Sequence, residues 1–163
     1  MATLVIGIGN RHRRDDGVGV VVTSFLSDLD GPGLRIISTD SADVGLVDRW
    51  SADDTVFVVD AASGDDPPGT IHRFDATAAS LPAQMRGSPS THVLGLGEAI
   101  ALARVLNRLP RQLIVYAIVG GDFGYGGGLT TAVQDAAAEV ARRIRCEAAA
   151  RLRESMKQQR EED

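Results

Sequence analysis

The 163-residue sequence contains almost no lysine or cysteine. Its one lysine, Lys157, lies near the C-terminus, so P-loop phosphate binding, Schiff-base chemistry and Ser-Lys catalysis lack the residue they normally use. Its one cysteine, Cys146, cannot form an internal disulfide or a CxxC pair. These absences exclude disulfide-stapled secreted scaffolds and zinc sites built from cysteines.

Aromatic residues and positive charge are also scarce. Phe, Trp and Tyr make up 4% of the residues, too few for the stacking platforms that bind single-stranded nucleic acid, and the formal net charge is -5 at pH 7. No apolar run approaches the roughly 18 residues that a membrane span requires, and the first ten residues have no basic segment of the secretory type. We therefore expect a cytoplasmic protein that binds neither nucleic acid nor membranes.

The composition is that of an ordinary globular protein, with 44% hydrophobic residues, 24% charged residues and a mean hydropathy of -0.02. A chain of this length normally forms one domain. We expect a single domain over residues 1–153, followed by a polar C-terminal tail over residues 154–163 that frays.

Apolar patterning predicts strands that alternate with helices, the order typical of βαβ units. This order predicts an α/β fold with a mostly parallel sheet covered by helices on both faces. In such sheets, ligands bind beyond the carboxyl ends of the strands. The expected strands are 3–8, 34–38, 55–59, 70–74 (an edge strand) and 113–119, and the expected helices are 17–29, 44–50, 91–107 and 130–153, the last capped by Thr130.

Three carboxylates and a histidine follow the expected strand ends. Asp15 and Asp16 stand at the start of the first helix, Asp60 follows the strand that ends at residue 59, and His92 lies at the start of the third helix. Carboxylates and an imidazole from separate loops suit a divalent transition metal such as nickel, zinc or iron. Alternatively, the aspartates favour a helix N-terminus or cap a turn, and His92 follows a capping residue. The spacing leaves both interpretations open.

Two other kinds of site fit the sequence less well. The segment GIG at 7–9 follows a strand as in dinucleotide-binding folds, but His12 holds the third glycine position and the helix begins too late to meet a pyrophosphate. A Ser-His-Asp triad would need Ser88 or Ser90 beside His92, and the sequence has no Gly-x-Ser-x-Gly elbow. A small-ligand or nucleotide-binding module of the same sheet class is kept as an alternative function.

The segment GIGN at 7–10, followed by DDGVG at 15–19, resembles the N-terminal signature of the hydrogenase maturation endopeptidases, which trim the large subunits of nickel-iron hydrogenases. VFVVDA at 56–61 resembles their second motif, STH at 90–92 resembles their third, and the glycine-rich loop at 120–128 is similar too. The resemblance covers about residues 3–145. It implies a three-layer α/β/α sandwich whose five-stranded sheet is mostly parallel, with one antiparallel edge strand.

The resemblance also implies a set of catalytic and metal-contacting residues. In that family an acidic residue of the first motif, an aspartate after the third strand and a histidine at the third helix contact the metal, which here implies Asp16, Asp60 and His92. The first of these is often glutamate in the family, so Asp15 is an alternative to Asp16. The implied reaction is the removal of the C-terminal extension from a nickel-iron hydrogenase large-subunit precursor after nickel insertion. The nickel is presented by the precursor and is not permanently bound, so a nickel-free precursor lacks an anchor.

We expect substrate contacts around this set, from Asn10, Arg14, Asp15 and Asp122. Arg14 belongs to the arginine-rich segment 11–14, which suits carboxylates of a partner; the alternative is that these arginines are simply solvated. Asp122 in the glycine-rich loop serves turn formation about as well.

Two further interpretations fit the sequence. A non-cleaving adaptor for the metal-loaded precursor would need the same residues as the endopeptidase. His12 and His72 are interpreted as surface histidines, the second on the expected edge strand.

Overall fold

The computed structural model describes residues 1–82 and 91–162, with backbone alone for residues 91–94 and 162. A single sheet has the strand order β2-β1-β3-β5-β4. Its neighbouring strands run parallel except for β4, which is antiparallel to β5 at one edge. The strands are β1 (Thr3–Ile8), β2 (Leu34–Thr39), β3 (Thr55–Ala62), β4 (Ile71–Asp75) and β5 (Gln112–Val119). The prediction of a mostly parallel sheet with an antiparallel edge strand is confirmed.

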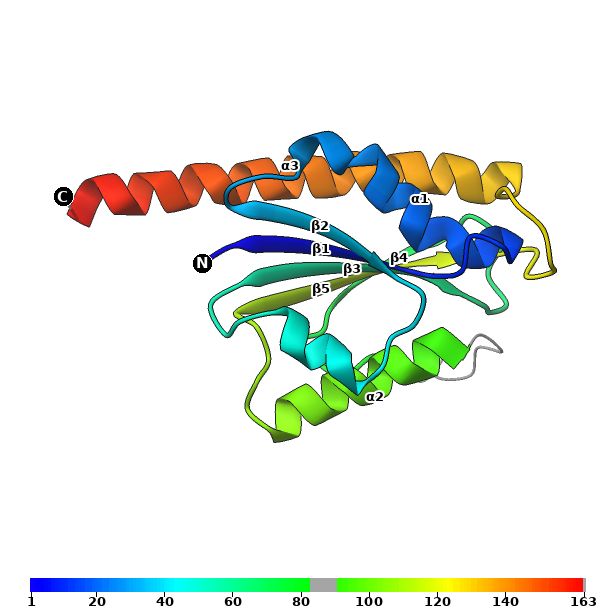
Figure 1. The fold of residues 1–163 in the computed structure, drawn as a ribbon, viewed down its shortest axis with the longest axis horizontal. Helices are drawn as coiled ribbons and strands as arrows, with labels where there is room; N and C mark the ends of the chain where they lie inside the picture. Colours follow the sequence, from blue (N-terminus) through cyan, green and yellow to red (C-terminus); the bar gives the residue numbers. More distant parts are fainter. Residues whose placement is uncertain (83–90, 163) are drawn as a thin grey trace.

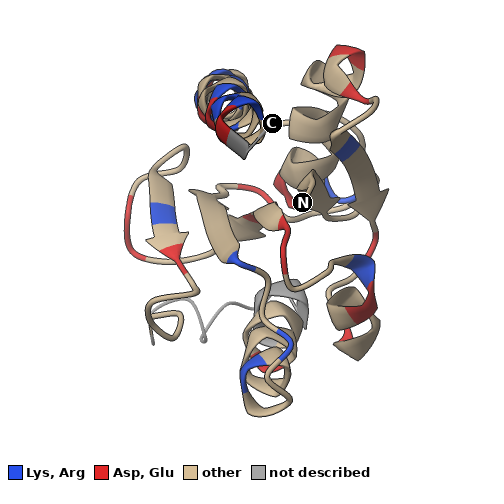
Figure 2. Cartoon of the chain, turned by 90° about the vertical axis from the view of Figure 1, so that its left-hand side faces the viewer, with Lys and Arg blue, Asp and Glu red and all other residues tan. Residues whose placement is uncertain are grey.

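Helices cover both faces of this sheet (Figure 1). One face carries α1 (Val18–Phe25) and α3 (Thr131–Glu162), and the other carries α2 (Thr91–Val105) and the 3-10 segment η3 (Val44–Arg49). In Figure 2, the charged residues lie mainly on the helices, the loops and the outer strands. The expected three-layer sandwich is therefore present.

The inner strands are apolar throughout because they are buried on both faces. On β3, Val56 and Val58 face the core beneath α2, whereas Phe57 and Val59 face the core beneath α1 and α3. All four side chains are fully buried. Since successive side chains of a strand point to opposite faces, Asp60 projects on the α2 side, like Val56 and Val58.

The expected helix over residues 17–29 is wrong in its extent. It consists of α1 between two 3-10 segments, η1 (Arg14–Gly17) and η2 (Ser27–Leu29). The hydroxyls of Thr23, Ser24 and Ser27 each donate to the carbonyl three residues earlier. Such side-chain bonds compete with the helical ladder, and the valine-rich sequence has a modest helix propensity, so the regular helix ends early.

Two further element ends differ from expectation by three residues or more. The strand expected to stop at residue 59 continues to Ala62, because pairing with β5 extends three residues beyond the last pair with β1. Asp60 therefore lies within β3 and does not follow it. The last helix does not end near residue 153 but continues to Glu162, since residues 154–162 contain no glycine or proline and mostly strong helix formers.

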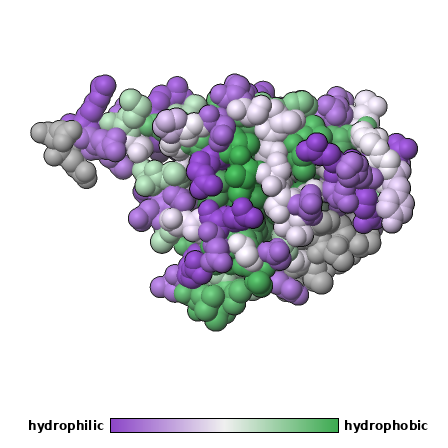
Figure 3. All heavy atoms as spheres, viewed as in Figure 1, coloured by the Kyte–Doolittle hydropathy of each residue, from purple (hydrophilic) through white to green (hydrophobic). Residues whose placement is uncertain are grey.

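The long α3 projects beyond the amino edge of the sheet (Figure 1). In the space-filling view, apolar surface is visible at the lower end of the molecule, where α2 ends and Val105 and Leu106 are exposed (Figure 3). No helix within the described ranges is both long and apolar enough to traverse a bilayer.

Candidate active site

The carboxyl ends of β1 and β3 meet the start of α1 at one edge of the sheet. A Cβ on Gly19 would lie 2.3 Å from the carbonyl oxygen of Ile8 and 2.5 Å from that of Val59. Only glycine lets the helix backbone approach both strands this closely. This contact fixes the segment before α1, with its two aspartates, at the edge where Asp60 lies.

Asp16 and Asp60 are both buried at this edge, with 1% and 0% of their surface exposed. Asp16 accepts a hydrogen bond from the backbone N–H of Asn10 at 3.2 Å, which closes the loop between β1 and η1. Asp60 accepts one from the N–H of Ala61 at 2.8 Å. Two buried carboxylates at the carboxyl edge, where ligands bind in parallel sheets, mark it as a candidate site.

His92 lies in the first turn of α2, which begins at the same edge of the sheet (Figure 1). Its side chain lies outside the described residues, as do Ser88 and Ser90 of the alternative triad. Among the side chains that are described, no three His, Cys, Asp or Glu residues form a metal-binding group. The assignment of Asp16, Asp60 and His92 as a metal-contacting set therefore stays a prediction.

Asp15 performs a different task from Asp16. Its carboxylate is fully buried and accepts hydrogen bonds from the backbone N–H groups of Gly121, Asp122 and Thr130 at 2.8, 3.0 and 2.8 Å. The Thr130 hydroxyl also contacts both of its oxygens, in place of the expected capping role for α3. Because this carboxylate already serves four donors of the glycine-rich loop and its exit, Asp16 is the better candidate for contact with a metal or substrate.

The glycine-rich loop is joined to the arginine-rich segment 11–14. Backbone hydrogen bonds link Arg14 N–H to the Gly126 carbonyl at 3.0 Å and Gly126 N–H to the His12 carbonyl at 2.9 Å. Arg14 has a positive φ of 46° and its guanidinium lies 3.4 Å from the Asp122 carboxylate. Arg13 stacks against the exposed ring of Tyr125. Residues 11–14 and 120–128 thus form one lip beside Asp16.

The other predicted substrate-binding residues belong to this lip or its base. The side chain of Asn10 accepts a hydrogen bond from His12 N–H at 2.9 Å, and Asp122 accepts one from Gly124 N–H at 2.9 Å. Arg14 and Asp122 are each about half exposed, whereas Asp15 is not exposed at all. The side chains of Arg14 and Asp122 can therefore contact a docked partner. Asp15 can affect such a partner only by holding the glycine-rich loop in place.

The glycines after β1 serve packing within the chain. A Cβ on Gly7 would lie 2.1 Å from the Gly19 carbonyl oxygen, and one on Gly9, whose φ is 149°, would lie 1.9 Å from the Asp16 carbonyl oxygen. These are the positions where a dinucleotide-binding loop would leave its backbone open to a phosphate. Here the chain itself occupies that space.

Sequence reasoning did not place His72 near this edge. It lies on β4, and its ring nitrogen Nε2 is 2.8 Å from a carboxylate oxygen of Asp66. The side chain is 36% exposed, but it lines a pocket that begins beside β3. Sheet register is the signal that brings it close to Asp60, and register cannot be derived from a single isolated strand pattern.

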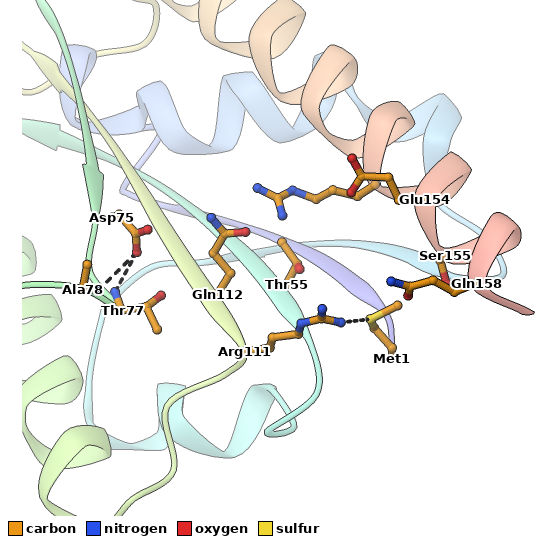
Figure 4. Close-up of a pocket in the computed structure, with 11 residues that line it drawn as sticks. Met1, Thr55, Asp75, Thr77, Ala78, Arg111, Gln112, Glu154, Ser155 and Gln158 are labelled. Atoms are coloured by element: carbon orange, nitrogen blue, oxygen red, sulfur yellow. Dashed lines mark hydrogen bonds between the residues drawn. The ribbon is translucent and has the colours of Figure 1, made fainter.

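A second pocket, of about 390 Å³, lies at the opposite end of the sheet (Figure 4). The last turns of α3 form one wall and the amino ends of β3 and β5 form another. Arg111 and Arg151 line it together with Asp75 and Glu154, so its charges balance. It contains none of the residues predicted for the site.

Comparison with known proteins identifies the family. The sequence model of the family described as hydrogenase maturation protease matches residues 35–147, more than half of the chain. The chain belongs to the hydrogenase maturation protease family. The resemblance predicted from the sequence motifs is therefore confirmed.

Individual relatives within the hydrogenase maturation protease family agree. The chain is 29% identical over 137 residues to the hydrogenase expression/formation protein HupD of Thiocapsa roseopersicina, covering 81% of this chain and 61% of HupD, so it spans less than two thirds of that relative. It is 27% identical over 137 residues to the hydrogenase 2 maturation protease of Escherichia coli K12, covering 82% of both proteins. The structure of the hydrogenase maturating endopeptidase HybD from E. coli matches with a TM-score of 0.79 and 25% identity, over 95% of this chain and 94% of that one.

Proposed function

We propose that this protein is an endopeptidase that removes the C-terminal extension of a nickel-iron hydrogenase large-subunit precursor after nickel has been inserted. Membership of the hydrogenase maturation protease family supports the reaction class. The observation that carries the proposal is the pair of buried carboxylates, Asp16 and Asp60, at the carboxyl edge of the sheet where the first turn of α2 also lies.

In this proposal the precursor brings the metal with it. Asp16, Asp60 and His92 complete the coordination of a nickel ion that the precursor already holds, because carboxylate and imidazole ligands suit this ion. A nickel-free precursor lacks that attachment and docks less tightly. When water attacks the peptide carbonyl, one of the two aspartates accepts the water proton and passes it to the leaving amine of the C-terminal extension.

A nucleotide-binding function is less well supported than this one. It requires the segment 7–10 to leave room for a phosphate, and that room is filled by the backbone around Asp16 and Gly19. The adaptor alternative requires the same residues as the peptidase, so only an activity measurement separates the two.

The test is the intact mass of a nickel-loaded large-subunit precursor from the same host after incubation with this protein, beside a nickel-free precursor. We expect the loaded precursor alone to lose a C-terminal peptide. Asp60→Asn should abolish this loss while the far-ultraviolet circular dichroism spectrum stays unchanged. Asp53→Asn, at an exposed position on the amino side of β3, is the matched control and should process normally.

Each other outcome contradicts a definite part of the proposal. Stable binding without any shortening would favour the adaptor. Shortening of both precursors would show that cleavage does not depend on nickel. Normal processing by the Asp60→Asn variant would refute the assignment of Asp60 to the active site.

A further inference from the structure

A pocket of about 480 Å³ opens between the ends of β3 and β5, the edge strand β4 and the loop from β3 to β4. This volume lies within the roughly 300–1,000 Å³ range of small-ligand sites, so it can hold a short peptide segment. The lining residues that matter here are Ala62, Phe74 and Val119, which are apolar, and Asp65, Asp66 and His72, which are polar.

Sheet register connects this pocket to the candidate catalytic edge. Ala117 on β5 pairs with Asp60 on one side and with His72 on the other. The three residues therefore form one row across three strands. Ala62, Ala117 and Phe74 pack together on the α2 side, and the His72 ring stacks beside Phe74 at 6.0 Å, so His72 shares the face of Asp60. Between them lies the methyl group of Ala117, which is fully buried against Ala62 and Phe74.

The polar rim of the pocket is held in place and carries negative charge. His72 Nε2 lies 2.8 Å from Asp66, and the stacking on Phe74 restricts the ring further. Asp65 and Asp66 supply two carboxylates, and no lysine or arginine occurs among the described residues that line the pocket. The base consists of Ala62 and Val119, each 3% exposed. A side chain with an apolar stem and a cationic head matches this combination.

We propose that this pocket binds an arginine or lysine side chain of the precursor, two or three residues away from the bond that is cut. This inference rests on the proposed function, since it takes the bond to lie at Asp16 and Asp60. Neighbouring strands are about 4.8 Å apart, so the backbones at Asp60 and His72 are separated by roughly 10 Å across the row. An extended peptide advances about 3.3 Å per residue and covers that distance in about three residues.

The first experiment measures cleavage of nickel-loaded precursors in which arginine or glutamine is placed in turn at each of four positions on either side of the bond. We expect arginine to raise kcat/KM on the order of tenfold over glutamine at one position, two or three residues from the bond. The double variant Asp65→Asn, Asp66→Asn should lose this preference and still cleave. Asp53→Asn should retain it. A double variant that keeps the preference, or the absence of any preferred position, would overturn the inference.

A binding experiment decides the inference independently of cleavage. The chain has three histidines, so the imidazole signals of His12, His72 and His92 can be resolved by NMR. The probes are acetyl-Ala-Ala-Arg-Ala-Ala-amide and the same peptide with neutral citrulline in place of arginine. We expect the arginine peptide to shift the His72 signals at several-fold lower concentration, with His12 unaffected. Equal shifts from both peptides, or none from either, would refute the pocket assignment even if no precursor is ever cleaved.

Discussion

Replacing Asp15 by asparagine should separate structural from catalytic roles at the site. The carboxylate serves three backbone N–H groups and one hydroxyl, and it is fully buried. Asparagine keeps one oxygen for Gly121, Asp122 and the Thr130 hydroxyl, but turns its NH2 group toward the Thr130 N–H. Hydrogen bonds to a charged acceptor contribute about 1.5–3 kcal/mol each, so the loss of one and the weakening of the others at a neutral acceptor lower the free energy of unfolding by about 3 kcal/mol.

The assay is urea unfolding of the Asp15→Asn variant followed by circular dichroism, with thermal unfolding as a second measurement. For a domain of this size, about 3 kcal/mol corresponds to a fall in Tm of roughly 6–12 °C. Amide exchange should accelerate most at Thr130, because its N–H loses its acceptor, whereas Gly121 and Asp122 keep a neutral acceptor. Asp53→Asn should change stability by less than about 0.5 kcal/mol. A loss below about 1 kcal/mol for Asp15→Asn would show that the loop does not depend on this carboxylate.

Three other predictions concern packing, ionisation and the end of the chain. Gly19→Ala should lower the free energy of unfolding in urea by about 3 kcal/mol or more, because its methyl group would clash with the carbonyls of β1 and β3. Gly97→Ala, whose methyl group meets no atom within 4 Å, should instead stabilise α2 by about 0.5–1 kcal/mol. Equal effects of the two substitutions would contradict this account. Burial and a neighbouring glutamate raise the pKa of Tyr116 from 10.0 to about 12, so its stabilising contribution is complete below pH 10 and is lost as the pH rises through 12. Absorbance titration at 295 nm in a Tyr125→Phe background should show this midpoint, and one near 10 would disprove the burial effect. Deleting residues 154–163 should reduce the helical circular dichroism signal at 222 nm but lower the free energy of unfolding by less than about 1 kcal/mol, since most of these side chains are exposed. A loss of about 3 kcal/mol would show that the segment supports the core.

The sequence predicts the elements well where one physical cause dominates. β1 is a continuous apolar run bounded by polar residues and glycine, and its predicted ends are confirmed at both residues. The expected end of β3 falls three residues short of the observed end, because a charged residue inside a strand resembles a strand end. Asp60 is tolerated there since β5 continues alongside it while β1 has already stopped.

The candidate site is likewise predictable from the sequence only in part. Asp16 and Asp60 could be assigned to one edge from the rule that ligands bind at the carboxyl ends of parallel strands. The different tasks of Asp15 and Asp16 could not be predicted from the sequence, because adjacent aspartates look alike there and differ only in which N–H groups they bind in the fold. The position of His72 relative to Asp60 could not be predicted either, because it depends on two strand registers.

The bonds made by Asp15 have a consequence for how the protein becomes active during synthesis. They connect it to residues 106, 107 and 115 positions later in the chain. Contacts at such separations form late, after the intervening chain has been ordered. A nascent chain that has already emerged with Asp16 and Asp60 still lacks the glycine-rich loop, and the lip closes only when the beginning of α3 has left the ribosome. The site is therefore unfinished until the segment that begins α3 has been synthesised.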